Sequence, residues 1–508
     1  MAKQIIKTSF LITLIMVAGH FLGLVKESVI ANYFGVSAQV DAYTIAITIP
    51  VTIFALISVS IQSIVIPIYT DLLYNKGKEI SSKYVDNLIS IISVFTLLII
   101  AVCELFASPL VHLFAPGFDN NTHDMGVSML RICMPTILFS IIDKVLIGLL
   151  NVHKQFVRPS LSVYFLNICL IITIIFLHST LGITAACIGQ VFGSIIQVLF
   201  LLIVAKKYYR YHYSFELFDL EIKKSIKQAL PVMWSISIAE LCAVINRVVA
   251  SFLFVGSISA LGYASKINSV FISFFTAAIS TIVYPFYAES IAKKDMSQFN
   301  NRINLTLSVY AFFLLPLIVY VFCFRHEIIQ LAFGRGAFGR DAVGITGSLL
   351  GCYAAGLLFM ALRENLTKVF YSVQDTKTPA KNATIGVCLN IFLNVSLPFL
   401  LGIQGLAIAT SVTALIISLL LIKDLTNKHQ DINISYFLNN LYRLFIISVI
   451  LYFLIKILLF FINFESSFVR LLFGGLLLTL FYIVLSFLFR IDVIERIKEM
   501  LKSSKNQI

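Results

Sequence analysis

Charged residues are scarce in this sequence: they make up 12% of its 508 residues, whereas hydrophobic residues make up 59%. A soluble chain carries about a quarter charged residues, so this composition excludes a wholly water-exposed surface. The 44 phenylalanines and 21 tyrosines suit membrane helices with aromatic residues at the lipid interface. The composition therefore predicts an integral membrane protein.

Cysteine motifs and long hydrophilic segments are also missing. None of the eight cysteines forms a CxxC pair, and all lie in or beside apolar stretches, so we interpret them as small buried residues. We predict no disulfide, no metal site and no cofactor. No connector exceeds roughly twenty residues, which leaves no room for a soluble catalytic domain, so we predict that the protein is not an enzyme.

Apolar stretches long enough to cross about 30 Å of hydrocarbon occur fourteen times. The predicted fold class is an all-α polytopic membrane protein with about fourteen transmembrane helices. No cleavage site follows the first stretch, so we expect an uncleaved first helix. The predicted spans are 9–31, 42–69, 86–113, 125–150, 160–178, 181–205, 228–254, 257–289, 303–324, 341–371, 382–400, 402–422, 440–463 and 467–489.

The net charge of +13 lies in short connectors between the apolar stretches, so we predict no nucleic-acid partner. Basic connectors such as 75–83 and 377–381 alternate with connectors such as 116–124, which contain no Lys or Arg. Lys and Arg accumulate on the cytoplasmic side, so we predict a multi-pass protein of the bacterial cytoplasmic membrane with both termini cytoplasmic. The connector 325–340 breaks the alternation, because it carries three arginines on the predicted outer side.

An internal repeat recurs at a spacing of about 220 residues. Pro159 and Gly182 in the first half correspond to Pro379 and Gly402 in the second half. Parallel repeats are a transporter architecture in which the substrate binds between the halves. The predicted domains are an N-terminal six-helix lobe at 1–220, a C-terminal six-helix lobe at 221–430, and two additional helices with a basic cytoplasmic tail at 431–508.

Ionisable residues inside the predicted helices mark the candidate site, because each costs about 2.5–3.5 kcal/mol on insertion scales. The predicted first, seventh and eighth helices carry Lys26, Arg247 and Lys266, and Lys and Arg recognise phosphate. We therefore predict a cationic, water-filled cavity for an anionic head group. The alternative is that Lys26 pairs with Glu27, and that Arg247 and Lys266 extend to an interface. The predicted substrate-binding residues are His20, Lys26, Glu27, Asp41, Arg247 and Lys266.

Uncharged polar residues form a second, weaker candidate. Asn390 and Asn394 are one helical turn apart, and with Thr410 and Asn246 they are a possible cation site. Uncharged ligands bind a cation weakly, so hydrogen bonding between helices is the favoured interpretation.

Adjacent opposite charges occur twice in the predicted helices. One helix carries Asp143 and Lys144, and another carries Arg363 and Glu364 with Lys368. Such neighbours are more often local pairs than substrate ligands, so we interpret both as local ion pairs.

Three motifs follow one another along the chain: Gly23–Glu27 with Asp41–Tyr43, then Ala250–Lys266, then Phe370–Pro379. Together they resemble the MurJ/MviN family of lipid II flippases, within the multidrug/oligosaccharidyl-lipid/polysaccharide exporter superfamily. The resemblance covers essentially the whole chain and agrees with fourteen helices. It implies that the family's cytoplasmic loop contains Asp375, Lys377, Thr378 and Pro379.

The resemblance implies a flippase that moves an undecaprenyl-pyrophosphate-linked saccharide across the cytoplasmic membrane by alternating access, with lipid II as the expected cargo. It implies a role in peptidoglycan and cell-wall biogenesis, and thereby in cell shape. The implied partners are the lipid-linked saccharide pyrophosphate, membrane lipids and cell-wall synthesis proteins.

The sequence departs from the family at several cavity positions. The resemblance implies arginines where this chain has His20, Lys26 and Lys266, and another where it has Phe54. Lysine keeps the charge but lacks the planar fork of arginine. A lipid-linked precursor of an exopolysaccharide, a capsule or a teichoic-type polymer is therefore the alternative cargo. Export of a small cation would require an acidic site, and a glycan polymerase would require a larger outer loop, so both are less favoured.

Overall fold

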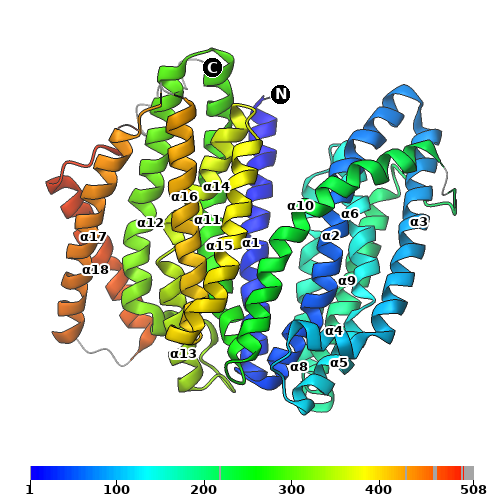
Figure 1. Ribbon diagram of the computed structural model, residues 1–508, viewed down its shortest axis with the longest axis horizontal. Helices are drawn as coiled ribbons and strands as arrows, with labels where there is room; N and C mark the ends of the chain where they lie inside the picture. Colours follow the sequence, from blue (N-terminus) through cyan, green and yellow to red (C-terminus); the bar gives the residue numbers. More distant parts are fainter. Residues whose placement is uncertain (1, 217–218, 430–431, 462–465, 494–495, 497–508) are drawn as a thin grey trace. The chain divides into compact units, whose positions relative to one another are not determined.

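A computed structural model of the chain describes residues 2–216, 219–429, 432–461, 466–493 and 496 (Figure 1). Side chains are described from Leu11 onward, except at 56–64 and at many positions within 220–239 and 277–288. Every regular element in these residues is a helix. The helices of the first half are α1 (Ala2–Phe34), α2 (Ala38–Asn75), α3 (Lys78–Leu105), α4 (Ala107–Phe114), α5 (Asn120–Cys133), α6 (Thr136–Val152), α7 (Val157–Ser160), α8 (Ser162–Leu181) and α9 (Thr184–Ala205). Those that follow are α10 (Leu220–Ser251), α11 (Ser257–Ala292), α12 (Met296–Phe333), α13 (Arg340–Ala354), α14 (Leu357–Ser372), α15 (Lys377–Leu401), α16 (Gln404–Lys428), α17 (Ser435–Phe461) and α18 (Ser467–Leu488).

The predicted fold class, an all-α membrane protein with about fourteen transmembrane helices, is confirmed. Ten helices are long and apolar enough to cross a membrane, and the pairs α5–α6 and α13–α14 each make one further bent span. The remaining two are α10 and α11, which are 32 and 36 residues long and coincide with the predicted spans 228–254 and 257–289.

Three predicted spans are interrupted, which the sequence analysis did not anticipate. The predicted span 86–113 is divided between α3 and α4 at Phe106. The α5–α6 pair bends by 40° near Pro135, which has no backbone N–H to continue a helix. The α13–α14 pair bends by 43° near Gly356, where a Cβ atom would lie only 2.6 Å from Ser411 Oγ. These two bends therefore follow from proline and from close helix packing. A hydropathy pattern reports neither of these features.

The predicted internal repeat is present in the backbone. Lys154 and Gln374 follow α6 and α14, and both have positive φ angles, of 59° and 62°. Gly182 and Gly402 end α8 and α15 with φ angles of 57° and 58°. Each pair has the repeat spacing of about 220 residues. Glycine suits this left-handed conformation because it has no Cβ atom.

The chain divides into two compact units, Met1–Ser259 with Gly336–Phe338, and Ala260–Arg335 with Gly339–Ile508. In the first unit α2 packs against α5, α6 and α10, while α8 packs along α9 (Figure 1). The α8–α9 contact uses Gly189 and Gly193, where a Cβ atom would come within 2.9 Å of α8 backbone atoms. Small residues four apart let membrane helices approach closely. In the second unit α12 packs against α13, α17 and α18, and α15 packs along α16. The lobes at 1–220, 221–430 and 431–508 stay predictions.

Candidate functional site

The charged residues of α1 lie on a partly exposed part of the helix. Lys26 Nζ lies 2.9 Å from Glu27 Oε1, and the two side chains are 18% and 24% exposed. His20 is exposed and lies almost two turns earlier on the same helix. The predicted alternative, a Lys26–Glu27 pair, is therefore present. A partly solvated pair contributes only about 0–1 kcal/mol, so a stronger anionic ligand can displace the Glu27 carboxylate.

The other two predicted cations lie on α10 and α11. Arg247 is half-buried, and its Nη1 donates to the carbonyl oxygen of Ala243, one turn earlier, at 3.1 Å. Lys266 is also half-buried. Arg247 belongs to the first unit together with Lys26, whereas Lys266 belongs to the second unit. Their common role as ligands of one anion stays a prediction.

Asp41 lies in the first turn of α2 and is buried. Its Oδ2 accepts the backbone N–H of Gly256 at 2.7 Å, and its Oδ1 accepts that of Ser259 at 2.7 Å. The carboxylate thus satisfies backbone donors at the start of α11, where a helix leaves N–H groups unpaired. Gly256 is required here, because its φ of 95° and a distance of only 2.5 Å from a Cβ atom to Val36 both exclude larger residues. In this conformation Asp41 therefore holds the α10–α11 turn.

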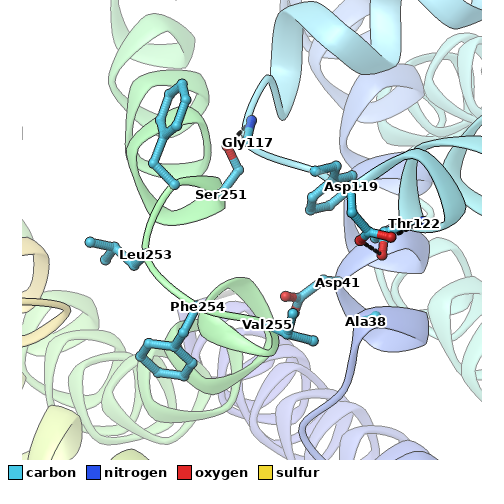
Figure 2. A pocket seen from close by; sticks show the side chains of 11 residues that line it. Ala38, Asp41, Gly117, Asp119, Thr122, Ser251, Leu253, Phe254 and Val255 are labelled. Carbon is cyan, nitrogen blue, oxygen red and sulfur yellow. Dashed lines mark hydrogen bonds between the residues drawn. The ribbon is translucent and has the colours of Figure 1, made fainter.

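A cavity of about 210 Å³ lies beside Asp41, lined by the start of α2, the α4–α5 connector and the α10–α11 turn (Figure 2). Across it, Ser251 Oγ accepts the N–H of Gly117 at 3.1 Å. Asp119 caps α5 by accepting hydrogen bonds from the Thr122 hydroxyl and from the N–H groups of Thr122 and Asn121. These bonds, that of the Thr122 hydroxyl first, hold the pKa of Asp119 below its usual value. Ligand pockets usually measure about 300–1,000 Å³, so this cavity is too small for a saccharide.

The predicted cation site is a hydrogen-bonded helix contact in the second unit. Asn394 Nδ2 donates to Asn390 Oδ1 at 2.7 Å, and Asn390 Nδ2 donates to Thr413 Oγ1 on α16 at 3.2 Å. Thr410 instead donates to the carbonyl oxygen of Leu406 on its own helix. Asn246 lies on α10 in the first unit, and its Oδ1 is buried without a partner among the described residues. No group of three His, Cys, Asp or Glu side chains suited to a metal ion occurs in the described part of the chain.

The two predicted local ion pairs differ. Asp143 and Lys144 are paired at 3.2 Å, and Asp143 also accepts from Gln197 on α9 at 2.9 Å. Arg363 is exposed and Glu364 is half-buried, and the local pairing of Arg363, Glu364 and Lys368 stays a prediction. Successive residues on a helix do not face each other, so an adjacent pair needs favourable side-chain rotamers.

The family loop at 375–379 is held together by Asp375 in the second unit. Its carboxylate accepts the N–H of Thr378 at 3.0 Å and the Thr378 hydroxyl at 2.6 Å, and Lys428 Nζ lies 2.8 Å away. Lys428 and Thr378 hold the pKa of Asp375 well below its usual range. Lys377 is exposed, whereas Pro379 is buried in the first turn of α15, where its missing N–H leaves no bond unmade.

The depressed pKa of Asp375 predicts a pH dependence of this loop. A carboxyl group with a lowered folded-state pKa stabilises the fold above its unfolded pKa of about 4, and this contribution is lost as the pH falls below that value. We expect hydrogen-exchange protection of the Thr378 amide, corrected for intrinsic rates, to decrease below about pH 4. Lys428→Met should lower the protection at neutral pH and weaken its pH dependence. Identical profiles for both proteins would contradict this role of Lys428.

Sequence reasoning missed a cluster that fastens the α9–α10 connector to α3. Asp86 Oδ1 accepts the Tyr209 hydroxyl at 2.5 Å and the N–H of His212 at 3.0 Å. Asn87 bonds both backbone groups of Glu216, at 2.6 and 2.9 Å. Burial, followed by the bond to Asp86, raises the pKa of Tyr209. The available signal was the polar Asp86–Asn87 pair at the edge of an apolar stretch.

Fourteen spans, an internal repeat and cations within helices define a polytopic membrane transporter. A solved transporter of the multidrug resistance MATE family, of the MOP superfamily, has this fold, with a TM-score of 0.64 at 13% identity over 84% of this chain and 94% of that one. The model of the family described as "Lipid II flippase MurJ" matches residues 30–489. The chain therefore belongs to the lipid II flippase MurJ family.

Individual relatives agree with this membership. A protein of Buchnera aphidicola described as "Probable lipid II flippase MurJ" is 27% identical over 95% of this chain and 98% of its own. The lipid II flippase MurJ of Thermosipho africanus is 27% identical over 87% of this chain and 90% of its own. A solved lipid II flippase MurJ in an inward closed conformation has a TM-score of 0.83 at 27% identity, over 96% of this chain and 100% of that one.

Proposed function

We propose that this protein is a flippase that translocates lipid II across the cytoplasmic membrane by alternating access. The observation that carries the proposal is the family match over residues 30–489, supported by a solved MurJ structure that superposes over 96% of the chain. The proposal fits a chain whose described residues contain ten membrane spans, two bent spans, the two further long helices α10 and α11, and no long connector.

In the proposed mechanism, cations bind the pyrophosphate while the lipid tail stays in the bilayer. Lys26 exchanges the carboxylate of Glu27 for a phosphate oxygen, because their partly exposed pair is weak. Arg247 and Lys266 supply further positive charge. His20, on the same helix as Lys26, supplies a further polar contact to the head group. Rocking of the two halves then releases the saccharide on the outer side. Asp41 keeps the α10–α11 turn in place in the state described here.

The proposed topology places both termini in the cytoplasm, on the strength of the connector charges. A single cysteine at Asn120 should then be labelled by an impermeant thiol reagent from outside intact cells, and one at Lys377 should not. Both positions are exposed, so accessibility depends on the side of the membrane. The native cysteines are replaced by serine or alanine as the control background. Labelling of both positions from one side would contradict the topology.

The departures at His20, Lys26, Lys266 and Phe54 bear on the cargo. Point charges in place of arginine forks should retain the pyrophosphate but select the saccharide less strictly. We expect the chain to restore growth in cells depleted of their lipid II flippase. In cells lacking an exopolysaccharide flippase, partial rescue would indicate a broader range of lipid-linked glycans. Rescue of only the exopolysaccharide strain would favour the alternative, a dedicated non-peptidoglycan precursor.

A further inference from the structure

Two segments of the first unit meet where membrane helices end. Residues 153–158 follow α6, and residues 206–216 follow α9, which is long and apolar enough to cross a membrane. The ring of His153 stacks on that of Tyr208, with the ring centroids 4.5 Å apart and the planes inclined by 19°. The Tyr69 hydroxyl of α2 lies 3.0 Å from His153 Nε2 and holds this ring from its other edge. The stack therefore places both segments at the same surface of the membrane.

The segment 206–216 is also fixed in depth along α3. The cluster around Asp86 and Asn87 fastens its backbone to this helix. One turn further along α3, Ser90 Oγ lies 2.8 Å from the Tyr211 hydroxyl. Ser90 lies inside the apolar stretch that begins at residue 86. The Tyr211 hydroxyl therefore lies where hydrocarbon gives way to the head groups, a level at which tyrosine is enriched in membrane proteins.

The exposed side chains of the two segments are mainly cationic or aromatic. The cations, all of them exposed, are Lys154, Arg158, Lys206, Lys207 and Arg210. The exposed rings beside them are those of Phe156, Tyr211, Tyr213 and Phe215. None of the five cations forms an ion pair with a carboxylate in the described part of the chain. The one acidic residue of the two segments, Glu216, instead pairs with Lys83 of α3 at 2.8 Å. The five positive charges are therefore available to a ligand.

We propose that these five cations form a basic surface that binds the phosphates of anionic phospholipids. Clusters of about four to eight Lys or Arg directly beside a membrane helix recognise anionic head groups, and both side chains donate to phosphate oxygens. The exposed rings favour a lipid over a soluble anion, because tyrosine and phenylalanine beside the cations can enter the head-group layer. Assignment to the cytoplasmic leaflet rests on the proposed topology, whereas the binding itself does not.

The test uses the purified full-length protein in detergent, with native mass spectrometry of bound phosphatidylglycerol and of phosphatidylcholine with the same acyl chains. The variant combines Lys206→Gln, Lys207→Gln and Arg210→Gln. The control combines Lys294→Gln, Lys381→Gln and Lys423→Gln, which removes the same charge from exposed positions of the second unit. We expect the variant to bind phosphatidylglycerol at least about tenfold more weakly, with the control unchanged. The fold should be preserved, because Asp86 and Asn87 fasten the segment through other residues. A variant that exchanges Lys for Arg and Arg for Lys at the same three positions should bind like the wild type.

Equal phosphatidylglycerol binding by the variant and the control would overturn the proposal, because the loss would then follow net charge rather than this surface. Equal binding of phosphatidylcholine and phosphatidylglycerol by the wild type would overturn it too. Glycerol 1-phosphate is the competitor that distinguishes a lipid from a soluble phosphate. If it displaces phosphatidylglycerol at an equal concentration, the surface recognises the phosphate alone and the lipid assignment is wrong. Because binding is measured without transport, the result is independent of whether the chain flips lipid II.

Discussion

Replacement of Lys26 by alanine is expected to reduce transport by about tenfold to hundredfold, the value of one or more charge-assisted hydrogen bonds to phosphate. The motivation is that Lys26 lies in a partly exposed part of α1 with only a weak carboxylate pair. Lys26→Arg should be tolerated, because it keeps the charge. The measurement is the rate of lipid II translocation into the outer leaflet of reconstituted vesicles, with Lys381→Ala as an exposed control.

A double variant separates phosphate binding from simple pairing with Glu27. If Lys26 only neutralises Glu27, then Lys26→Gln combined with Glu27→Gln removes both charges together and should retain transport. If Lys26 binds the pyrophosphate, the double variant should be as impaired as Lys26→Gln alone. Arg247→Ala and Lys266→Ala should show losses similar to that of Lys26→Ala. Full activity in all three alanine variants would rule out the cationic site.

Asp41→Ala is expected to produce the largest loss of stability, about 3 kcal/mol. The substitution leaves the buried N–H groups of Gly256 and Ser259 without the acceptor that now lies 2.7 Å from each. Asp41→Asn should lower the stability by about half as much. Its amide oxygen can still accept one of the two N–H groups, but its NH2 group cannot accept the other. The measurement is the unfolding midpoint of the purified protein in detergent.

Asp124→Asn is the matched control for Asp41, since its side chain is 83% exposed and its partner in the described part of the chain is His123, at 3.4 Å. It should leave the midpoint unchanged. If Asp41→Ala unfolds at the same midpoint as this control, the α10–α11 turn does not depend on the buried carboxylate.

The fourteen spans could be predicted because lipid imposes long apolar stretches that few other environments require. The ends of the helices were less accessible to prediction. Helix α3 begins at Lys78, two turns before the predicted start at residue 86, and α2 extends to Asn75. Helices continue into water beyond their apolar part when the exposed turns contain good helix formers, and hydropathy does not register this.

The interruptions within helices show which bends can be predicted from local sequence and which cannot. Pro135 was a visible signal for the bend between α5 and α6. Phe324 carried no such signal, because its kink depends on the fit of its ring against Gly474 of another helix. A tertiary contact of this kind lies outside the information in a local pattern.

For the candidate site residues, too, contacts between sequence neighbours could be predicted and contacts between distant residues could not. The Lys26–Glu27 pair was foreseen as an alternative, because both partners are adjacent in sequence. The partners of Asp41 were not, because Gly256 and Ser259 lie more than 200 residues away and contribute backbone groups rather than side chains. For Asn390 the partner is Thr413, one helical turn from the expected Thr410, whose hydroxyl bonds its own helix. Rotation about a helix axis decides such contacts.

The most direct test of the central claim is depletion of this protein in its own cells, followed by analysis of the lipid-linked precursors on each leaflet. The account predicts that lipid II accumulates on the inner leaflet and disappears from the outer leaflet, and that expression of the wild-type chain reverses both changes. Accumulation of a different undecaprenyl-linked saccharide, with lipid II distributed as before, would contradict it.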